Sequence, residues 1–194
     1  MAVACFLPWP RTIANTSCMH YSFWNMDLLP EILDRKSARS FLSRAIEKDQ
    51  MERILEAGRL APSAKNRQEW RFIVIQKKEI RERIKEAAFG QELVSQAAAV
   101  IAVCTTNIDY RMPNGQLAYP MDLSFAASFM VLQAVHEGLS TCCMTTFDEQ
   151  EVREILTVPF SMRVVMLILM GYSEDGGEQS SRKSLKQVTG RDHW

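Results

Sequence analysis

The sequence lacks the features that would place the protein in a membrane or on nucleic acid. No apolar run approaches the roughly 18 residues that a membrane-spanning helix needs, and a run such as residues 164–170 has the length of a strand. A surplus of either charge is also missing, because 23 basic residues balance 23 acidic ones. A general nucleic-acid binder needs a basic surface to displace counterions from phosphates. We therefore expect neither a membrane nor a nucleic acid as partner.

Common metal and nucleotide motifs are missing as well. The 5 cysteines form no CxxC pair and the 3 histidines are scattered, so a metal site is not expected. Neither GxGxxG nor GxxxxGK[ST] occurs. No histidine lies in a motif that would activate a cysteine, and Cys104 lies in an apolar run typical of the core. The odd number of cysteines, two of them adjacent, favours a reduced, cytosolic compartment.

The composition is that of a globular protein of one domain, with 194 residues, 47% hydrophobic and 24% charged. Its first 25 residues differ from the rest, since they show no clear periodicity and Arg11 is their only charge. Arg11 follows the apolar segment instead of preceding it, which disfavours a signal peptide. We expect residues 1–27 to be an extension outside the core, with Met26 as the functional start. The alternative is an arm that packs on a partner subunit.

Periodicity and turn residues predict four strands and five helices in the remaining chain. The predicted strands are residues 70–75, 98–104, 141–144 and 164–172. The predicted helices are residues 28–34, a segment between a capping box at Asp49–Glu52 and Pro62, residues 77–89, residues 121–137, and a segment from a second capping box at Asp148 to Leu156. Pattern rules alone indicate a layered α/β fold with helices on both faces of the sheet.

Two further expectations concern the middle of the chain. The helix at residues 121–137 carries few charges, so it should be buried on most sides, and Gly138 should end it. Residues 105–120 are rich in Asn, Asp, Pro and Gly and are predicted to form a loop. Its Tyr110, Met112 and Tyr119 suggest an exposed flap over a pocket, although a plain connection is equally compatible with the pattern.

Two polar segments could bind a ligand. Residues 34–39 place three cations and a hydroxyl close together, which suits a phosphate, because guanidinium groups bind its oxygens bidentately. The alternative is a solvated charge run near a helix end. Residues 61–66 are mostly small, so a planar ligand could approach their backbone closely. A simple loop that ends a helix would look the same.

Together these segments resemble the flavin-binding signature of the nitroreductase family. Residues 35–41 read Arg-Lys-Ser-Ala-Arg-Ser-Phe, and residues 61–70 read Ala-Pro-Ser-Ala-Lys-Asn-Arg-Gln-Glu-Trp. Further matches follow in the family's order: Phe89-Gly90-Gln91, Asp122, residues 138–141, residues 145–148, Met170-Gly171-Tyr172 and the tail 182–194. Arg67 and Glu69 depart from the commoner small residue and proline around Gln68.

The resemblance implies an α+β fold with helices on both faces of a mixed, mostly antiparallel sheet. Residues 28–194 would form a single nitroreductase-like FMN-binding domain. The resemblance also implies a homodimer with FMN at the subunit interface, and it corrects the pattern-based expectation in strand direction. The loop after Cys104 is short for the family, so the chain resembles a compact member without a helical lid.

Cofactor contacts carry over from the resemblance position by position. The phosphate and ribityl end would be held by Arg35, Lys36, Ser37 and Arg182. Arg39 would lie beside N1 and O2 of the isoalloxazine ring. The other subunit would line the ring with Pro62, Ser63, Ala64 and Asn66. The pyrimidine edge would meet Cys143, Thr145 and Thr146, with the Thr146 backbone N–H aimed at N5, and Gln91 would add a ring contact.

The activity implied by the resemblance is that of an FMN-dependent NAD(P)H oxidoreductase. Hydride would pass from NAD(P)H through flavin N5 to a nitroaromatic, quinone or similar acceptor in a ping-pong cycle. The chemistry belongs to the flavin, so no side-chain general base is required. One alternative is an FMN-binding or redox-sensing protein with little turnover, and another is a scaffold without flavin.

Overall fold

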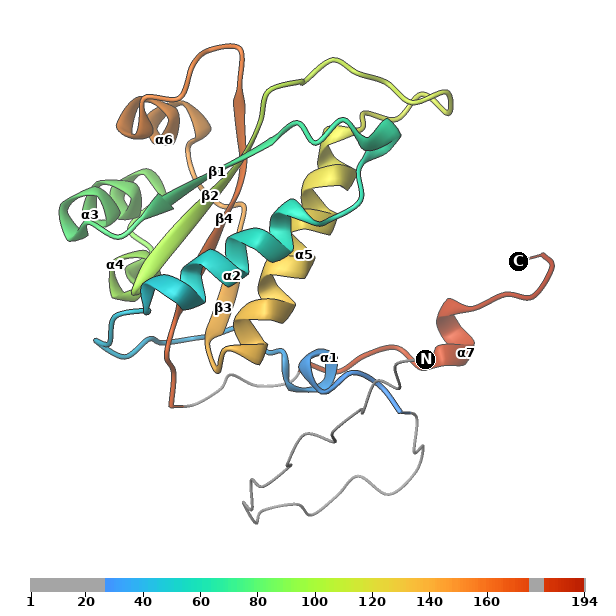
Figure 1. The fold of residues 1–194 in the computed structure, drawn as a ribbon, viewed down its shortest axis with the longest axis horizontal. Helices are drawn as coiled ribbons and strands as arrows, with labels where there is room; N and C mark the ends of the chain where they lie inside the picture. The colour runs from blue at the N-terminus through green and yellow to red at the C-terminus, as the bar shows by residue number, and fades with distance from the viewer. Residues whose placement is uncertain (1–26, 175–179, 194) are drawn as a thin grey trace, which may run out of the picture.

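The computed structural model describes residues 27–174 and 180–193. Nearly all of the predicted extension, and the terminal Trp194, lie outside these ranges. The sheet has four strands, β1 (Trp70–Ile75), β2 (Ala99–Thr105), β3 (Ser140–Met144) and β4 (Arg163–Gly171). Their order is β1-β2-β4-β3, and each neighbouring pair is antiparallel (Figure 1). All four predicted strands are confirmed, with ends that differ by at most one residue.

Helices cover both faces of this sheet, so the fold is α+β. The described helices are α1 (Pro30–Asp34), α2 (Lys48–Arg59), the 3-10 turn η1 (Ala64–Asn66), α3 (Lys78–Ala87), α4 (Glu92–Gln96), α5 (Tyr119–His136), α6 (Glu149–Leu156) and α7 (Leu185–Val188). The sequence patterns missed η1, α4 and α7, each of which is only three to five residues long. Such short segments show too little periodicity to be recognised. In the part of the chain that the structure describes, no helix is long and apolar enough to cross a membrane.

Alternate side chains of the central strand β2 enter two hydrophobic cores, one on each face. One set packs beneath α2 and α5 and consists of Ala99, Ile101 and Val103. The other set packs beneath α3, α4 and α6 and consists of Val100, Ala102 and Cys104. Burial raises the pKa of the Cys104 thiol to about 12, so this cysteine behaves as a core hydrophobe.

A β-bulge in β4 changes which side chains face α5. The register shifts between Val103 and Cys104, where Val164 and Met166 are the consecutive partners on β4 and Val165 is left over. Because side chains alternate along a strand, the extra residue sends Val164 into the core on the α3 and α6 side while Met166 faces α5. Met166 shares the α5 face with Ile168 and Met170, and the bulge instead removes Val164 from that face.

Both predicted capping boxes differ in detail from the structure. Helix α2 begins at Lys48, and its capping box joins Glu47 to Gln50, so the prediction of Asp49 and Glu52 is wrong. Several acidic residues compete there, and the buried anchor Ile46 favours the earlier start. At α6 the Asp148 carboxylate accepts the Glu151 N–H at 3.0 Å, as predicted. The backbone N–H of Asp148 donates its hydrogen bond to the Ala87 carbonyl and not to the Glu151 side chain, so the second half of the predicted capping box is wrong.

Helix α5 has one face in the core and one apolar face in solvent, so the expectation of burial on most sides is wrong for the single chain. Its exposed hydrophobic residues, spaced four apart, are Met121, Phe125 and Phe129, each 41–43% exposed. Helix α1 lies near the C-terminal end of α5 and exposes Leu29, Ile32 and Leu33. Gly138, with φ of +75°, follows the end of α5 as predicted.

The C-terminal tail lies apart from the sheet and its helices (Figure 1). Every described residue from Ser180 to His193 is exposed, including the apolar Leu185 and Val188 of α7. Exposed apolar side chains on a segment that contacts little of its own chain are typical of an arm that packs on another molecule.

Candidate functional site

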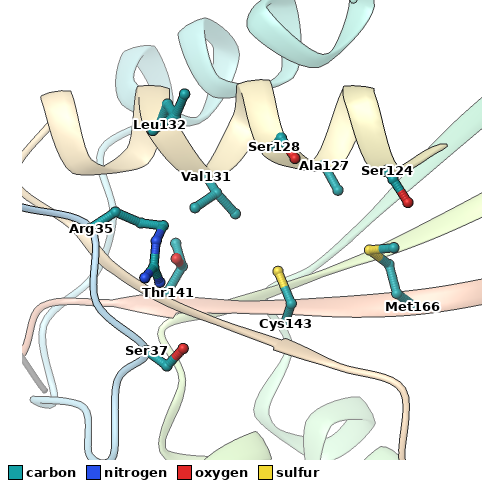
Figure 2. Close-up of a pocket in the computed structure, with 10 residues that line it drawn as sticks. All are labelled: Arg35, Ser37, Ser124, Ala127, Ser128, Val131, Leu132, Thr141, Cys143 and Met166. Atoms are coloured by element: carbon teal, nitrogen blue, oxygen red, sulfur yellow. The ribbon is translucent and has the colours of Figure 1, made fainter. Parts of the chain in front are cut away.

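A hollow of about 440 Å³ lies between α5 and the edge strand β3, within the size range of small-molecule sites (Figure 2). We call it the α5–β3 pocket. Its wall on α5 includes Ser124, Ser128 and Val131. The opposite side consists of Thr141, Cys143 and Met166, together with Arg35 and Ser37 from the segment that follows α1. Three predicted cofactor contacts, Arg35, Ser37 and Cys143, therefore meet here.

Main-chain pairing holds the Arg35–Ser37 segment against the sheet. Ser37 forms an isolated parallel bridge with Thr141, and the Ala38 N–H is donated to the Thr141 carbonyl at 2.9 Å. This bridge is the parallel component that makes the sheet mixed. Phe41 packs farther along, over Gly171, where a Cβ would lie only 3.0 Å from the Phe41 ring. The absence of a side chain at Gly171 thus lets the segment approach β4.

Adjacent cysteines of β3 point to opposite sides of the sheet. Burial raises the pKa of the Cys142 thiol, which packs against the core on the α3 and α6 side, and the charge of Arg39 opposes this rise. Burial also raises the pKa of Cys143; Cys142 adds to the rise and Arg35 opposes it. Solvent reaches Cys143, but the walls of the pocket surround it, so desolvation dominates its pKa. Arg35 lines the pocket, whereas Arg39 is exposed and lies outside its lining.

The predicted ring-lining loop lies at the other end of α5 (Figure 1). The Ala64 N–H is donated to Oδ1 of Asp122, in the first turn of α5, at 2.9 Å. The pocket residue Leu132 lies ten positions farther along the same helix, a separation of about 15 Å at 1.5 Å per residue. One chain therefore does not bring Pro62, Ser63, Ala64 and Asn66 to Arg35.

The remaining predicted contacts lie outside the lining of the pocket. Lys36 is half-buried beside it, and Thr145 and Thr146 are exposed in the turn between β3 and α6. Gln91 precedes α4, on the opposite face of the sheet. Arg182 lies in the tail, where its side chain donates to the carbonyls of Ser180 and Ser181.

Sequence reasoning missed the α5 wall of the pocket. Ser124 and Ser128 are spaced one helical turn apart in a helix that otherwise has few polar residues. That spacing places both hydroxyls on one face of the helix, and it is the sequence feature that could have revealed this wall of the pocket. Met166 alternates regularly with Ile168 and Met170 on the α5 side, but the sequence does not show which face of the sheet α5 covers.

The loop between β2 and α5 is packed down more closely than the flap expectation suggested. Tyr110, Met112 and Tyr119 are half-buried, not exposed. The Arg67 guanidinium lies 3.9 Å from the centroid of the Tyr110 ring, and Arg163 donates to the Tyr119 hydroxyl at 3.0 Å. These cations cover the rings. Phe147, in the turn between β3 and α6, packs against the core on the α3 and α6 side.

Known proteins provide an independent comparison. The Nitroreductase family model matches residues 32–119 and 90–172. A protein of Archaeoglobus fulgidus with the provisional name NADH dehydrogenase/NAD(P)H nitroreductase is 32% identical, over 77% of this chain and 87% of its own length. The FMN reductase [NAD(P)H] of Bacillus subtilis is 23% identical, over 80% of this chain and 70% of its own.

A solved structure agrees with the sequence matches. The nitroreductase family protein of Clostridium difficile superimposes with a TM-score of 0.78 at 28% identity, over 87% of this chain and all of its own. Family model, relatives and fold thus converge on the resemblance that residues 35–41 and 61–70 indicated. The chain belongs to the nitroreductase family.

Proposed function

We propose that the protein is an FMN-dependent NAD(P)H oxidoreductase of the nitroreductase type. The observation that carries the proposal is the α5–β3 pocket, where the family's signature residues Arg35 and Ser37 face a hollow of cofactor size. The names of the relatives, which include an NAD(P)H-dependent FMN reductase, support the same donor and cofactor. The acceptor would be a nitroaromatic, a quinone or a similar small oxidant.

The residues at the pocket fit the phosphate end of FMN. Arg35 supplies a cation and Ser37 a hydroxyl at one side of the hollow, and charged hydrogen bonds of this kind are the strong ones. No acidic side chain is among the residues that line it, so an anion meets no repulsion there. Lys36 and the tail's Arg182 would add positive charge from outside the lining.

Bound FMN would supply two-electron chemistry, in which N5 takes a hydride from NAD(P)H and returns it to the acceptor in a ping-pong cycle. The chain itself would bind and orient. Thr145 and Thr146, in the exposed turn after β3, would offer backbone donors at the ring edge near N5. Arg39 would stabilise negative charge at N1 and O2. Cys143 and Gln91 would add ring contacts. No side chain needs to act as a general base.

A second copy of the chain would complete each site. Arg35 and the loop with Pro62, Ser63, Ala64 and Asn66 lie toward opposite ends of α5, whose exposed stripe of Met121, Phe125 and Phe129 suits a two-fold contact. An isologous dimer in which two α5 helices pack antiparallel would bring the loop of one copy toward Arg35 of the other. We therefore propose a homodimer with two FMN sites at its interface.

The reduced cysteines support a cytosolic location. Cys104, Cys142 and Cys143 are free thiols. Proteins of oxidising compartments tend to pair their cysteines. We place the protein in the cytoplasm on this ground.

Anaerobic reduction of the purified protein tests the proposed activity. We expect a yellow protein whose flavin absorbance bleaches within seconds of adding NADH or NADPH and returns when a nitroaromatic or quinone is added. A flavin that stays yellow for an hour would indicate an FMN-binding or redox-sensing protein with little turnover. A colourless protein that takes up no added FMN would overturn the proposal.

A further inference from the structure

The loop at residues 62–68 has a backbone that needs external support. Three non-glycine residues in it have left-handed φ angles: Lys65 at 54°, Asn66 at 53° and Gln68 at 54°. Side chains with a Cβ disfavour this region, because the Cβ approaches the following carbonyl oxygen. Such conformations persist where surrounding contacts fix them, and they cluster at ligand-binding sites.

Most hydrogen bonds of this loop are internal to it. The Gln68 N–H is donated to Ser63 Oγ at 3.0 Å, and the Gln68 amide donates to Asn66 Oδ1 at 3.0 Å. The Asn66 N–H is donated to the Ser63 carbonyl. These bonds shape the loop, but they do not fix its place on the rest of the protein.

Asp122 supplies the link to another element. Its Oδ1 accepts the Ala64 N–H at 2.9 Å, and among the described residues no other side chain outside the loop makes a hydrogen bond to residues 62–68. Asp122 is only 7% exposed. A carboxylate that accepts a backbone N–H makes one of the stronger hydrogen bonds, and Asp122 lies in the first turn of the regular helix α5. The contact is thus rigid on the α5 side.

A second contact covers the outer side of the loop without holding its backbone. The Tyr110 ring lies under the Arg67 guanidinium at 3.9 Å and near Lys65 Nζ at 5.7 Å. Both contacts involve only the ends of long side chains. Tyr110 therefore shields the loop, whereas Asp122 fixes the main chain.

We propose that Asp122 is a positioning residue for the cofactor: it ties the 62–68 loop to the helix whose next turns form the wall of the α5–β3 pocket. The inference rests on the proposed function, in which this loop lines the flavin ring in the site shared with the second copy. Because Asp122, Ser124 and Ser128 share one rigid helix, the carboxylate sets the distance between loop and pocket wall. Asp122 itself need not touch the flavin.

The test compares Asp122→Ala with Asn114→Ala. Asn114 is a matched control, because its side-chain oxygen also accepts one backbone N–H, that of Gln116 at 3.2 Å, and it lies outside the segments that match the flavin-binding signature. Asp122→Asn keeps an acceptor oxygen, and Asp122→Leu keeps the shape without one should the alanine variant fail to fold. Amide hydrogen exchange is measured on FMN-free protein. FMN affinity and the visible circular dichroism of bound flavin are measured on loaded protein.

In Asp122→Ala we expect exchange at the Ala64 amide to rise at least tenfold, FMN affinity to fall about tenfold, and the flavin dichroism to change. Asp122→Asn should stay close to wild type, and Asn114→Ala should show none of these effects. Equal losses of FMN affinity in the two alanine variants, or unchanged exchange at Ala64, would overturn the inference. Wild-type protein that binds no FMN would instead overturn the proposed function, and the assignment of Asp122 with it.

Discussion

Among single residues, Arg35 has the strongest claim to the cofactor. It is the one cation that lines the α5–β3 pocket, and within the described part of the chain it forms no ion pair. A guanidinium without a carboxylate partner, beside a hydroxyl and a hollow, is arranged for an anionic ligand. Several other cations of the fold are already engaged, for example Arg53 with Glu137 at 2.6 Å.

Replacing Arg35 with Ala should therefore weaken FMN binding. A hydrogen bond to a charged group contributes about 1.5–3 kcal/mol, which corresponds to a dissociation constant about 10- to 150-fold higher. Quenching of flavin fluorescence measures that constant. Arg44→Ala is the control, since Arg44 is exposed and stacks on Tyr172 at 3.7 Å, away from the pocket. An unchanged constant in Arg35→Ala would remove this residue from the phosphate site.

The sequence motif selects candidate site residues but does not place them. The motif at residues 35–41 predicts Arg35 and Ser37 as cofactor contacts, and the structure brings both to one pocket. The same motif gave no sign that Arg39 would lie outside the lining of that pocket. Spacing along a chain fixes a face only where the local structure is regular, and this segment pairs with the sheet through one isolated bridge.

At the scale of elements, one ion pair fastens α6 to β4. Glu149 accepts from Arg163 at 2.6 Å and from the Val164 N–H at 3.2 Å. The hydrogen bond from Arg163 holds the pKa of Glu149 below its usual value of 4.5, although partial burial opposes the shift. A carboxyl whose pKa is lower in the folded state stabilises the fold above its unfolded pKa. That contribution is lost as the pH falls through the folded value.

Glu149→Gln should make stability less sensitive to acid. We expect the wild type to lose stability steadily as the pH drops below 4.5, and the variant to lose less over the same interval because the titrating group is gone. Urea denaturation at several pH values from neutral down to about pH 3 measures the slope. Glu151→Gln is the control, as the Glu151 side chain is exposed and unpaired among the described residues. Parallel slopes in wild type and Glu149→Gln would contradict the assignment.

The sequence predicted where the strands lie along the chain more accurately than whether they pair in parallel or antiparallel. The bounds of β1, Trp70–Ile75, agree with the prediction because alternation and flanking polar residues mark both ends. β2 is buried on both faces, and such an apolar run looks the same in a parallel and an antiparallel sheet. Only the resemblance to the family indicated the antiparallel pairing. The bulge at Val165 left no trace in the pattern at all.

At the scale of the whole molecule, three features have no evident function in a single chain. Helix α5 exposes a phenylalanine stripe, the tail from Ser180 is exposed throughout, and the two halves of the predicted flavin site lie apart. Exposed apolar surface is unfavourable in a monomer, and separated halves of a site cannot bind one cofactor. The proposed two-fold dimer would account for all three features at once. Composition could not foresee this, because an exposed apolar stripe and a buried one have the same sequence pattern.

Mixing two inactive variants tests that arrangement. Arg35→Ala should impair one half of every site and Asn66→Ala the other half, so each homodimer has two damaged sites. A heterodimer has one doubly damaged site and one intact site, provided that the halves come from different chains. FMN binding should therefore recover when the two proteins are unfolded together and refolded, but not when either is refolded alone. Asn66 suits this role because its side chain is exposed and bonded only within its own loop. If binding fails to recover although mass spectrometry of the intact dimer shows heterodimers, each site is built within one chain, and the proposed dimer contact through α5 is wrong.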